Sequence, residues 1–339
     1  MLRQIINLIF CIGIIEIFLV FFVLVNILTF SLYVIDTRRR INKVVLLCLT
    51  LACGGIGACL GMRFARDKTE KWLFRLAALV GLVIAFIPMI HITHSLTLDR
   101  IIRYVEITHR CENWSAELNG YRIAFMTDFH VITDESMSRV AAELNDRNVD
   151  LVLLSGDFSM GNAHYRGTIR KIAQINTTDG IFGVEGNHDD YRRLFYAKAQ
   201  YGIISLDNNG VHIRHGFYLA GVHDMWNRSP NINEAIEGAC DDDFILLLSH
   251  NPDLSMRQST YGVDLILSGH THGGQITFFG FPMYLLRGSI THYGTRFGHG
   301  FASSADGTPV FVSRGIGVYY DIPRVFARPE VVIFSMYSE

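Results

Sequence analysis

Two patterns of hydrophobic residues divide the chain near residue 95. Before that point, three long apolar runs extend over about residues 5–35, 44–62 and 73–92. Each run can cross the roughly 30 Å hydrocarbon layer of a bilayer as a helix, which takes about 20 residues. Basic residues cluster between the runs, which is unusual for buried core helices of a soluble protein. Residues 1–95 are therefore predicted to form an all-α transmembrane region of three helices.

From residue 120 onward the apolar runs are short and are separated by turns. Helices are predicted at residues 134–145 and 166–175, and strands at 121–127, 151–155, 181–184, 217–222, 244–249, 263–268, 310–312 and 331–336. Continuous apolar strands that alternate with helices are typical of α/β domains with covered sheets. We therefore expect an α/β domain at residues 120–339, and we interpret the polar residues 96–119 as a linker.

Composition and charge support this division. Half of the residues are hydrophobic, only 18% are charged, and the mean hydropathy is +0.25, so a disordered chain is excluded and a wholly soluble protein is disfavoured. Residues 1–95 carry ten Lys and Arg against four Asp and Glu, whereas the remainder carries twenty against twenty-eight. The acidic C-terminal part suits cation binding and disfavours nucleic acid, which needs basic surface. The six cysteines show no CxxC spacing, so no disulfide framework is expected.

We expect a multi-pass protein of the cell membrane. The two connections between the apolar runs carry nearly balanced numbers of basic residues. The positive-inside rule therefore leaves open the side on which the C-terminal domain lies.

Polar residues gather directly after five of the predicted strands. They are Asp128 and His130, then Asp157, then Asn187 with His188 and Asp189, then His250, and finally His270 with His272. The carboxyl ends of parallel strands meet at one edge of a sheet, where ligands bind. One such Asp or His has an ordinary explanation as a turn or cap residue, but G-H-T-H together with four more strand-end motifs favours a metal site. Seven of these nine residues, all except His188 and Asp189, are taken as candidate metal ligands. Seven oxygen and imidazole donors exceed the three or four ligands of one zinc ion and indicate two metals that share a carboxylate.

The motifs D-x-H, G-D, G-N-H-D, a lone S-H and G-H-T-H resemble those of the calcineurin-like metallophosphoesterase superfamily. The stretches LLLSHNP, DLILSGHTHGGQ, VSRGIG and RPE resemble its bacterial membrane-associated branch. This resemblance covers about residues 120–337 and implies a four-layer α/β/β/α metallophosphoesterase sandwich with a dinuclear site. Met160 stands where many relatives have a second Asp, which implies altered bonding around intact metal ligands.

The resemblance also implies a role for each site residue. The first metal would be bound by Asp128, His130 and His272, and the second by Asn187, His250 and His270. Asp157 would bridge the two metals. His188 would be a non-ligand acid or transition-state stabiliser, and Asp189 would orient it.

A second resemblance concerns the membrane region. NILTFSLYVIDTRRR and GGIGACLGMRFARDKTEKWLF are similar to segments of a family of small bacterial membrane proteins of unknown function, over about residues 20–80. Asp67 stands where that pattern usually has His. Gly54, Gly57 and Gly61 lie near one helix face and predict a close helix approach, either between chains or within this one.

Together these observations predict a membrane-anchored dinuclear metal-dependent phosphoesterase. It would hydrolyse a phosphodiester or pyrophosphate by attack of a metal-bound hydroxide, with Mn, Fe or Zn as the divalent ions. Tethering to the lipid bilayer makes a lipid-linked or envelope substrate reasonable. The alternatives are a nucleotide phosphodiesterase or nuclease, and a non-catalytic metal-binding membrane scaffold. The oligomeric state stays open.

Further candidate substrate contacts rest on weaker signals. Arg192 and Arg193 follow G-N-H-D and would bind a second phosphate, and His223 and Asp224 would line the cleft. The apolar residues 278–286 follow the metal loop directly. They either face lipid or pack on the core.

Overall fold

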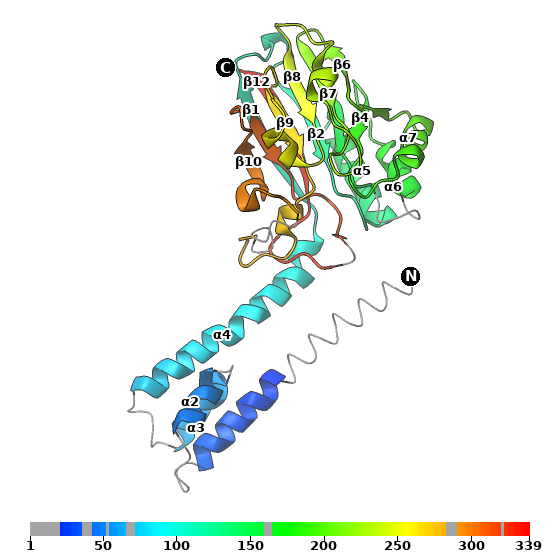
Figure 1. The fold of residues 1–339 in the computed structure, drawn as a ribbon. Coiled ribbons are helices and arrows are strands. Elements are labelled where there is room, and N and C mark those ends of the chain that lie inside the picture. Colours follow the sequence, from blue (N-terminus) through cyan, green and yellow to red (C-terminus); the bar gives the residue numbers. More distant parts are fainter. Residues whose placement is uncertain are drawn as a thin grey trace. The chain divides into compact units, whose positions relative to one another are not determined.

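A computed structural model describes residues 21–35, 43–51, 54–65, 72–158, 165–282, 290–319 and 322–339. The chain divides into two compact units, Met1–Leu96 and Thr97–Glu339 (Figure 1). Asp67, Met160 and the first part of the predicted first membrane helix lie outside the described residues.

The described part of the N-terminal unit is helical. Its helices are Phe21–Ile35, α2 (Lys43–Leu51), α3 (Gly55–Ala65) and α4 (Trp72–Leu96). Within the described residues, one helical segment, Trp72–Arg100, is long and apolar enough to cross a membrane, and Phe21–Ile35 is apolar but shorter. The predicted second span is divided, because α2 ends before Gly54 and α3 begins after it. Three membrane-spanning helices therefore stay a prediction.

Gly57 and Gly61 of α3 lie against the helix Phe21–Ile35. The Gly57 backbone N–H donates to Oδ1 of Asn26 at 2.8 Å, and a Cβ atom at Gly57 would lie 2.0 Å from the Asn26 carbonyl oxygen. A Cβ atom at Gly61 would lie 2.5 Å from Cβ of Tyr33. The predicted close approach of helices is confirmed, and both helices belong to this chain.

The C-terminal unit contains two six-stranded mixed sheets. In spatial order, the first consists of β1 (Arg103–Cys111), β12 (Glu330–Ser338), β2 (Tyr121–Met126), β3 (Leu151–Ser155), β4 (Ile181–Val184) and β5 (Ile204–Ser205). The second consists of β10 (Gly300–Ser303), β11 (Pro309–Val312), β9 (Leu265–Ser268), β8 (Phe244–Leu248), β7 (Phe217–Gly221) and β6 (Asn209–Arg214). Strands β2 to β5 are parallel, as are β11, β9, β8 and β7. The α/β prediction is confirmed, and each sheet has an edge where carboxyl ends gather.

The segment expected to be a linker contributes a strand instead. β1 pairs in parallel with β12 along its whole length, from Arg103 beside Glu330 to Cys111 beside Ser338. β1 is an edge strand, and its residues alternate between exposed and half-buried over much of its length. The polar residues that suggested a linker occupy the exposed positions of this strand.

Alternation along the strands explains how the sheets are covered. Successive strand residues point to opposite faces of a sheet. In β2, Ala124 and Met126 pack with the helices α5 (Asp134–Asp146), α6 (Tyr165–Ile172) and α7 (Tyr191–Gln200). Ile123 and Phe125 instead join an apolar cluster that both sheets supply. On the other face of the second sheet, alternate strand residues pack with α8 (Ile232–Ile236). The sheets are thus held rigidly, and the loops after their strands are positioned accurately.

Candidate metal centre

The candidate site is built on loops that follow parallel strands of both sheets. Asp128 follows β2, Asp157 follows β3 and Asn187 follows β4, while His250 follows β8 and His270 follows β9. All seven predicted ligands lie within the described residues, and the distances below join them into one cluster.

Asp128, His130 and His272 form one side of this cluster. Nε2 of His130 lies 3.0 Å from Nε2 of His272, which lies 3.3 Å from Oδ1 of Asp128. Metal–nitrogen bonds of about 2.0–2.1 Å hold neighbouring donor atoms roughly 3 Å apart. The three side chains are buried, and their spacing fits one cation.

Asn187, His250 and His270 form the other side. Oδ1 of Asn187 lies 3.1 Å from Nε2 of His250 and 2.9 Å from Nδ1 of His270. In each ring, the nitrogen that does not face Asn187 faces a backbone carbonyl oxygen. Nδ1 of His250 lies 2.6 Å from the Ser155 oxygen, and Nε2 of His270 lies 3.0 Å from the Ile290 oxygen. An imidazole that donates from one nitrogen can accept at the other. These bonds direct a lone pair of each ring toward Asn187.

Asp157 lies between the two sides. Its Oδ2 atom is 3.2 Å from Nε2 of His130 and 3.3 Å from Nε2 of His250. One carboxylate oxygen thus faces a donor from each set of three. The structure brings together all seven predicted metal residues.

The backbone around these residues is unusual. Five of the seven have φ between 34° and 70°, a left-handed region that is uncommon for residues other than glycine: Asp128, His130, Asp157, His270 and His272. Glycines of the same motifs permit close contact. A Cβ atom at Gly186 would lie 2.3 Å from Oδ1 of Asp157, and one at Gly269 would lie 2.1 Å from Oγ1 of Thr127. Backbone strain at several positions of one site indicates that the loops are held for function.

Burial determines the charge of these groups. It lowers the pKa of His270 to about 3, and burial with the neighbouring His130 and Arg324 lowers the pKa of His272 well below its ordinary value. Both rings are therefore neutral at neutral pH, which is the form that binds metals. Burial acts to raise the pKa of Asp157, but its interactions with His250 and His130 outweigh that effect, and the net pKa of this carboxylate lies well below its ordinary value.

Asp189 differs from its expected role. Its carboxylate accepts hydrogen bonds from the backbone N–H groups of Asp157 and Gly186, both at 2.8 Å, and of Phe158 at 2.9 Å. Among the described residues it makes no hydrogen bond with His188. The His188 ring instead packs beside Tyr319 at 5.2 Å. Asp189 therefore fastens the loops after β3 and β4 to each other, and the described contacts do not join its carboxylate directly to the His188 ring.

In the loop after β7, sequence reasoning pointed to His223 and Asp224 but missed Trp226 and Asn227, which contact the metal candidates. The Trp226 ring lies edge-on to His270 at 4.7 Å, and Nδ2 of Asn227 donates to the Asn187 carbonyl at 2.6 Å. The motif H-D-M-W-N-R follows a strand as the other motifs do, and this placement was a signal for it.

The weaker substrate candidates meet different outcomes. Asp224 is buried and accepts a hydrogen bond from the Trp226 backbone N–H. Nδ1 of His223 lies 2.6 Å from Oε1 of the buried Glu185. Both residues therefore stabilise the loop after β7. Arg193 pairs with Asp190 on an exposed part of α7. No described contact joins it to the seven metal residues.

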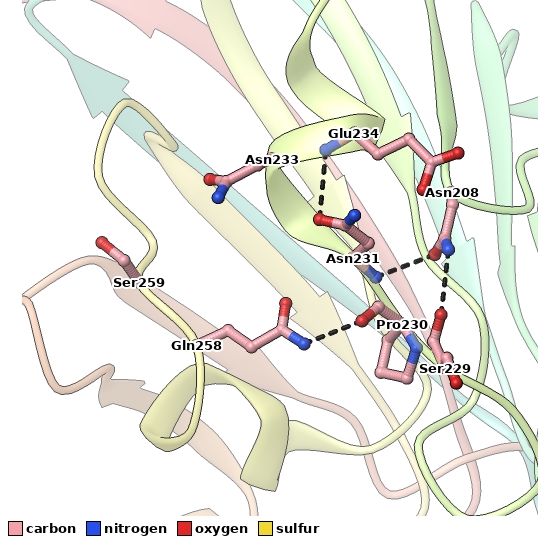
Figure 2. A pocket seen from close by; sticks show the side chains of 8 residues that line it. All are labelled: Asn208, Ser229, Pro230, Asn231, Asn233, Glu234, Gln258 and Ser259. Atoms are coloured by element: carbon pink, nitrogen blue, oxygen red, sulfur yellow. Dashed lines mark hydrogen bonds between the residues drawn. The ribbon is translucent and has the colours of Figure 1, made fainter.

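A cavity of about 520 Å³ lies beside the same loop and is separate from the metal residues (Figure 2). Oδ1 of Asn208, in its wall, accepts hydrogen bonds from the backbone N–H groups of His223 and Asn231. Figure 2 also shows that Nε2 of Gln258 donates to the Pro230 carbonyl, and that Oδ1 of Asn231 accepts a hydrogen bond from the Glu234 backbone N–H at the start of α8. This cavity wall serves mainly to hold the loop after β7.

The family of calcineurin-like phosphoesterases matches residues 121–274, a range that holds all seven donors described above. The chain carries a calcineurin-like metallophosphoesterase domain. This family consists of metal-dependent phosphoester hydrolases. Residues 26–74 match a second family, described as a protein of unknown function (DUF1294), in agreement with the resemblance found for the membrane region.

Several relatives are named as metallophosphoesterases. One from Helicobacter pylori is 29% identical over 63% of this chain and 58% of its own length, and one from Campylobacter jejuni is 27% identical over 85% and 77%. Both are named uncharacterised metallophosphoesterases. A zebrafish relative, 25% identical over 79% of this chain and 64% of its own length, is named a transmembrane protein with a metallophosphoesterase domain. The chain thus spans little more than half of the Helicobacter relative.

Proposed function

We propose that this protein is a membrane-anchored phosphoesterase with two divalent metal ions, acting on a phosphodiester or pyrophosphate bond. The observation that carries the proposal is the position of Asp157. Its Oδ2 atom lies 3.2 Å and 3.3 Å from the imidazole nitrogens of His130 and His250, which belong to different donor sets. A carboxylate between two such sets is suited to bridge two ions.

The proposal assigns a role to each donor. One ion would be held by Asp128, His130 and His272, the other by Asn187, His250 and His270, and Asp157 would touch both. Mixed imidazole and oxygen ligands suit Mn, Fe or Zn. Two such ions would supply a hydroxide nucleophile at neutral pH and neutralise charge on the phosphoryl oxygens.

His188 is the proposed catalytic group outside the metal ligands. Burial lowers the pKa of its ring, which is therefore neutral at neutral pH and holds one proton. Its backbone N–H donates to Oδ1 of Asp157 at 2.9 Å, so the residue is held beside the proposed bridging carboxylate. From there the ring N–H can donate a hydrogen bond to a phosphoryl oxygen as negative charge develops on it.

We extend the proposal to the architecture of the whole chain. Residues 1–95 would form the three-helix membrane module, and the unit that begins at Thr97 would be a four-layer α/β/β/α sandwich. α4 has 25 residues, and at 1.5 Å per residue it is about 37 Å long, enough for the roughly 30 Å hydrocarbon layer. Tethering of the domain at a bilayer favours a lipid-linked phosphoester by proximity.

A nucleotide phosphodiesterase is the second candidate, because of Trp226. Its indole is 47% exposed and lies next to His270. A nucleobase could stack on this ring, because aromatic side chains bind bases of any sequence by stacking. The Trp226→Ala variant distinguishes the two candidates. The measurement compares its rate of hydrolysis of a nucleotide diester with its rate for an aliphatic diester.

The direct test is hydrolysis by the purified full chain with Mn²⁺, using a chromogenic phosphodiester and a phosphomonoester. We expect metal-dependent cleavage that falls by about 100-fold or more in Asp157→Asn and His188→Ala. Asp241→Asn and His215→Ala change exposed residues away from the described site and serve as matched controls. Wild-type rates in the two site variants would overturn the mechanism, and metal uptake without cleavage of any diester would favour the scaffold alternative.

A further inference from the structure

An exposed apolar ridge lies beside the loop that carries His272. Its side chains are between 40% and 51% exposed and are those of Ile276, Phe278, Phe279, Phe281 and Ile322. Apolar surface gathered in this way is typical of a contact with a partner or a membrane. Building on the proposed membrane anchoring, we propose that this apolar ridge rests in the interfacial layer of the bilayer and turns the metal centre toward amphipathic phosphoesters.

The apolar ridge is a fixed part of the fold. Phe278 and Phe281 exchange backbone hydrogen bonds of 2.9 and 3.0 Å and so close a tight turn. Phe279 at its tip has a φ of 49°, an uncommon conformation for a bulky side chain. The Thr277 backbone N–H donates to the Val325 carbonyl at 3.0 Å and fastens the turn to the neighbouring segment. The exposed rings are therefore presented by an ordered backbone.

The apolar ridge lies next to the first residues of the C-terminal unit. Oδ2 of Asp99 accepts a hydrogen bond of 2.8 Å from the Phe326 backbone N–H, and the Phe326 ring packs on Phe279 at 5.3 Å. The Arg328 side chain donates to the Ile101 carbonyl at 3.3 Å. Figure 1 shows these loops at the end of the unit where its first residues begin.

Chain connectivity then limits the distance between the apolar ridge and the bilayer. Asp99 comes three residues after Leu96, where α4 ends, so the two Cα atoms are at most about 11 Å apart. Each headgroup layer is roughly 5–8 Å thick. If α4 spans the membrane, Asp99 lies in this layer or just beyond it, and Phe326 links Asp99 directly to Phe279 of the apolar ridge.

The exposed residues around Asp99 favour lipid over protein as the occupant. Leu98 and Ile101 are about half exposed, and the exposed Arg100 and Arg103 stand among them. Apolar side chains interleaved with arginines are characteristic of segments that lie on anionic bilayers, where the former enter the interface and the latter bind phosphate groups.

The apolar ridge is also coupled to the metal centre. The Gln275 side-chain amide donates to the carbonyls of Tyr319 and Ile322 at 3.1 and 2.9 Å, and the Tyr319 ring lies 5.8 Å from that of His272. Arg324, which is fully buried, donates to the His272 carbonyl at 3.3 Å. Seating the apolar ridge in a bilayer would therefore fix the direction in which the site faces.

The test uses the full chain with a protease site inserted after Leu96, reconstituted in vesicles of phosphatidylcholine and phosphatidylglycerol. Flotation of the uncleaved chain with the vesicles tests whether the N-terminal unit anchors it in the bilayer. After complete cleavage we expect residues 97–339 to stay with the vesicles, and to bind again to protein-free vesicles of the same composition. Phe278→Ser, Phe281→Ser and Ile322→Ser together should raise the released fraction at least about tenfold. The control combines Tyr196→Ser and Tyr261→Ser, which remove exposed aromatic rings elsewhere.

Each outcome separates the two proposals. A chain that does not float before cleavage refutes the anchor. Release of the wild-type unit after cleavage refutes lipid binding by the apolar ridge, and it does not affect the proposal that the N-terminal unit anchors the chain. Binding only to vesicles that contain the cleaved membrane unit, or self-association without lipid binding, assigns the apolar ridge to a protein partner and overturns the lipid proposal. Equal unfolding midpoints for wild type and variant exclude misfolding as the cause of release.

Discussion

Asp189 illustrates at the residue scale why a motif does not determine the role of each of its members. In G-N-H-D the carboxylate stands next to His188, which favoured an orienting role. The fold turns it toward three backbone N–H groups of the loops after β3 and β4. The clustering of the seven proposed metal ligands was predictable because each lies in a loop that follows an apolar strand. The direction of a side chain inside a loop depends on the facing loop, which the sequence does not reveal.

This assignment predicts how Asp189→Asn behaves. An amide has one oxygen acceptor in place of two, so part of the bonding that holds Asp157 and Gly186 is lost. We expect about 10–100-fold weaker Mn²⁺ binding, typical of changes next to metal ligands. Isothermal titration of the full chain measures this. An unchanged metal affinity with a lower kcat would instead restore the role of orienting His188.

At the scale of elements, the predicted strands were correct where both faces are buried. The four edge strands β1, β5, β6 and β10 were missed, because they are partly exposed and therefore lack the continuous apolar run of the buried strands. Within the second membrane run, the structure shows a break at Gly54 that hydropathy does not register. The importance of the loop after β7 was underestimated, because its contacts are with residues far away in the sequence: His270 follows β9 of the same sheet, and Asn187 follows β4 of the other sheet.

That loop provides a prediction at the same scale. Asn227→Ala removes the hydrogen bond of 2.6 Å to the Asn187 carbonyl and should weaken binding of one of the two metals by about tenfold. Asn233→Ala, on α8 at the cavity of Figure 2, is the matched control. Titration with Mn²⁺ should show one altered and one unaltered step. Two unaltered steps would contradict a supporting role for the loop.

A second prediction concerns the junction of β11 and β12. Oε1 of Glu330 accepts hydrogen bonds from the Arg314 backbone N–H and from Ser313, and lies 3.2 Å from Nε2 of His299. Burial acts to raise the pKa of Glu330, but the hydrogen bond with His299 and the other contacts outweigh it, and the net shift is downward. The stabilisation is therefore present above the ordinary value of 4.5 and is lost as the pH falls through the lower folded pKa.

Glu330→Gln should therefore lower the unfolding midpoint at pH 7, by a free energy of about 1–3 kcal/mol. The difference from wild type should shrink as the pH is lowered below 4.5. Thermal unfolding of both proteins across this range measures it. A difference that grows toward acid pH would show that the carboxylate does not have a lowered pKa.

At the scale of the whole molecule, all seven metal residues belong to the unit Thr97–Glu339. Cleavage after Leu96 should therefore leave metal content and hydrolysis of a soluble diester within about twofold of the intact chain. Hydrolysis of a diester embedded in vesicles should fall when the apolar ridge is altered. Loss of soluble-diester activity on cleavage alone would show that the membrane unit contributes to the site.

The central claim is that two metal ions share Asp157, and metal content tests it most directly. The purified full chain, saturated with Mn²⁺ and freed of excess, would be analysed by elemental mass spectrometry beside Asp157→Asn and Asp241→Asn. We expect two ions per chain in wild type and in Asp241→Asn, and one or none in Asp157→Asn. A folded wild-type chain that retains a single ion, or an Asp157→Asn variant that retains two, would contradict the dinuclear site.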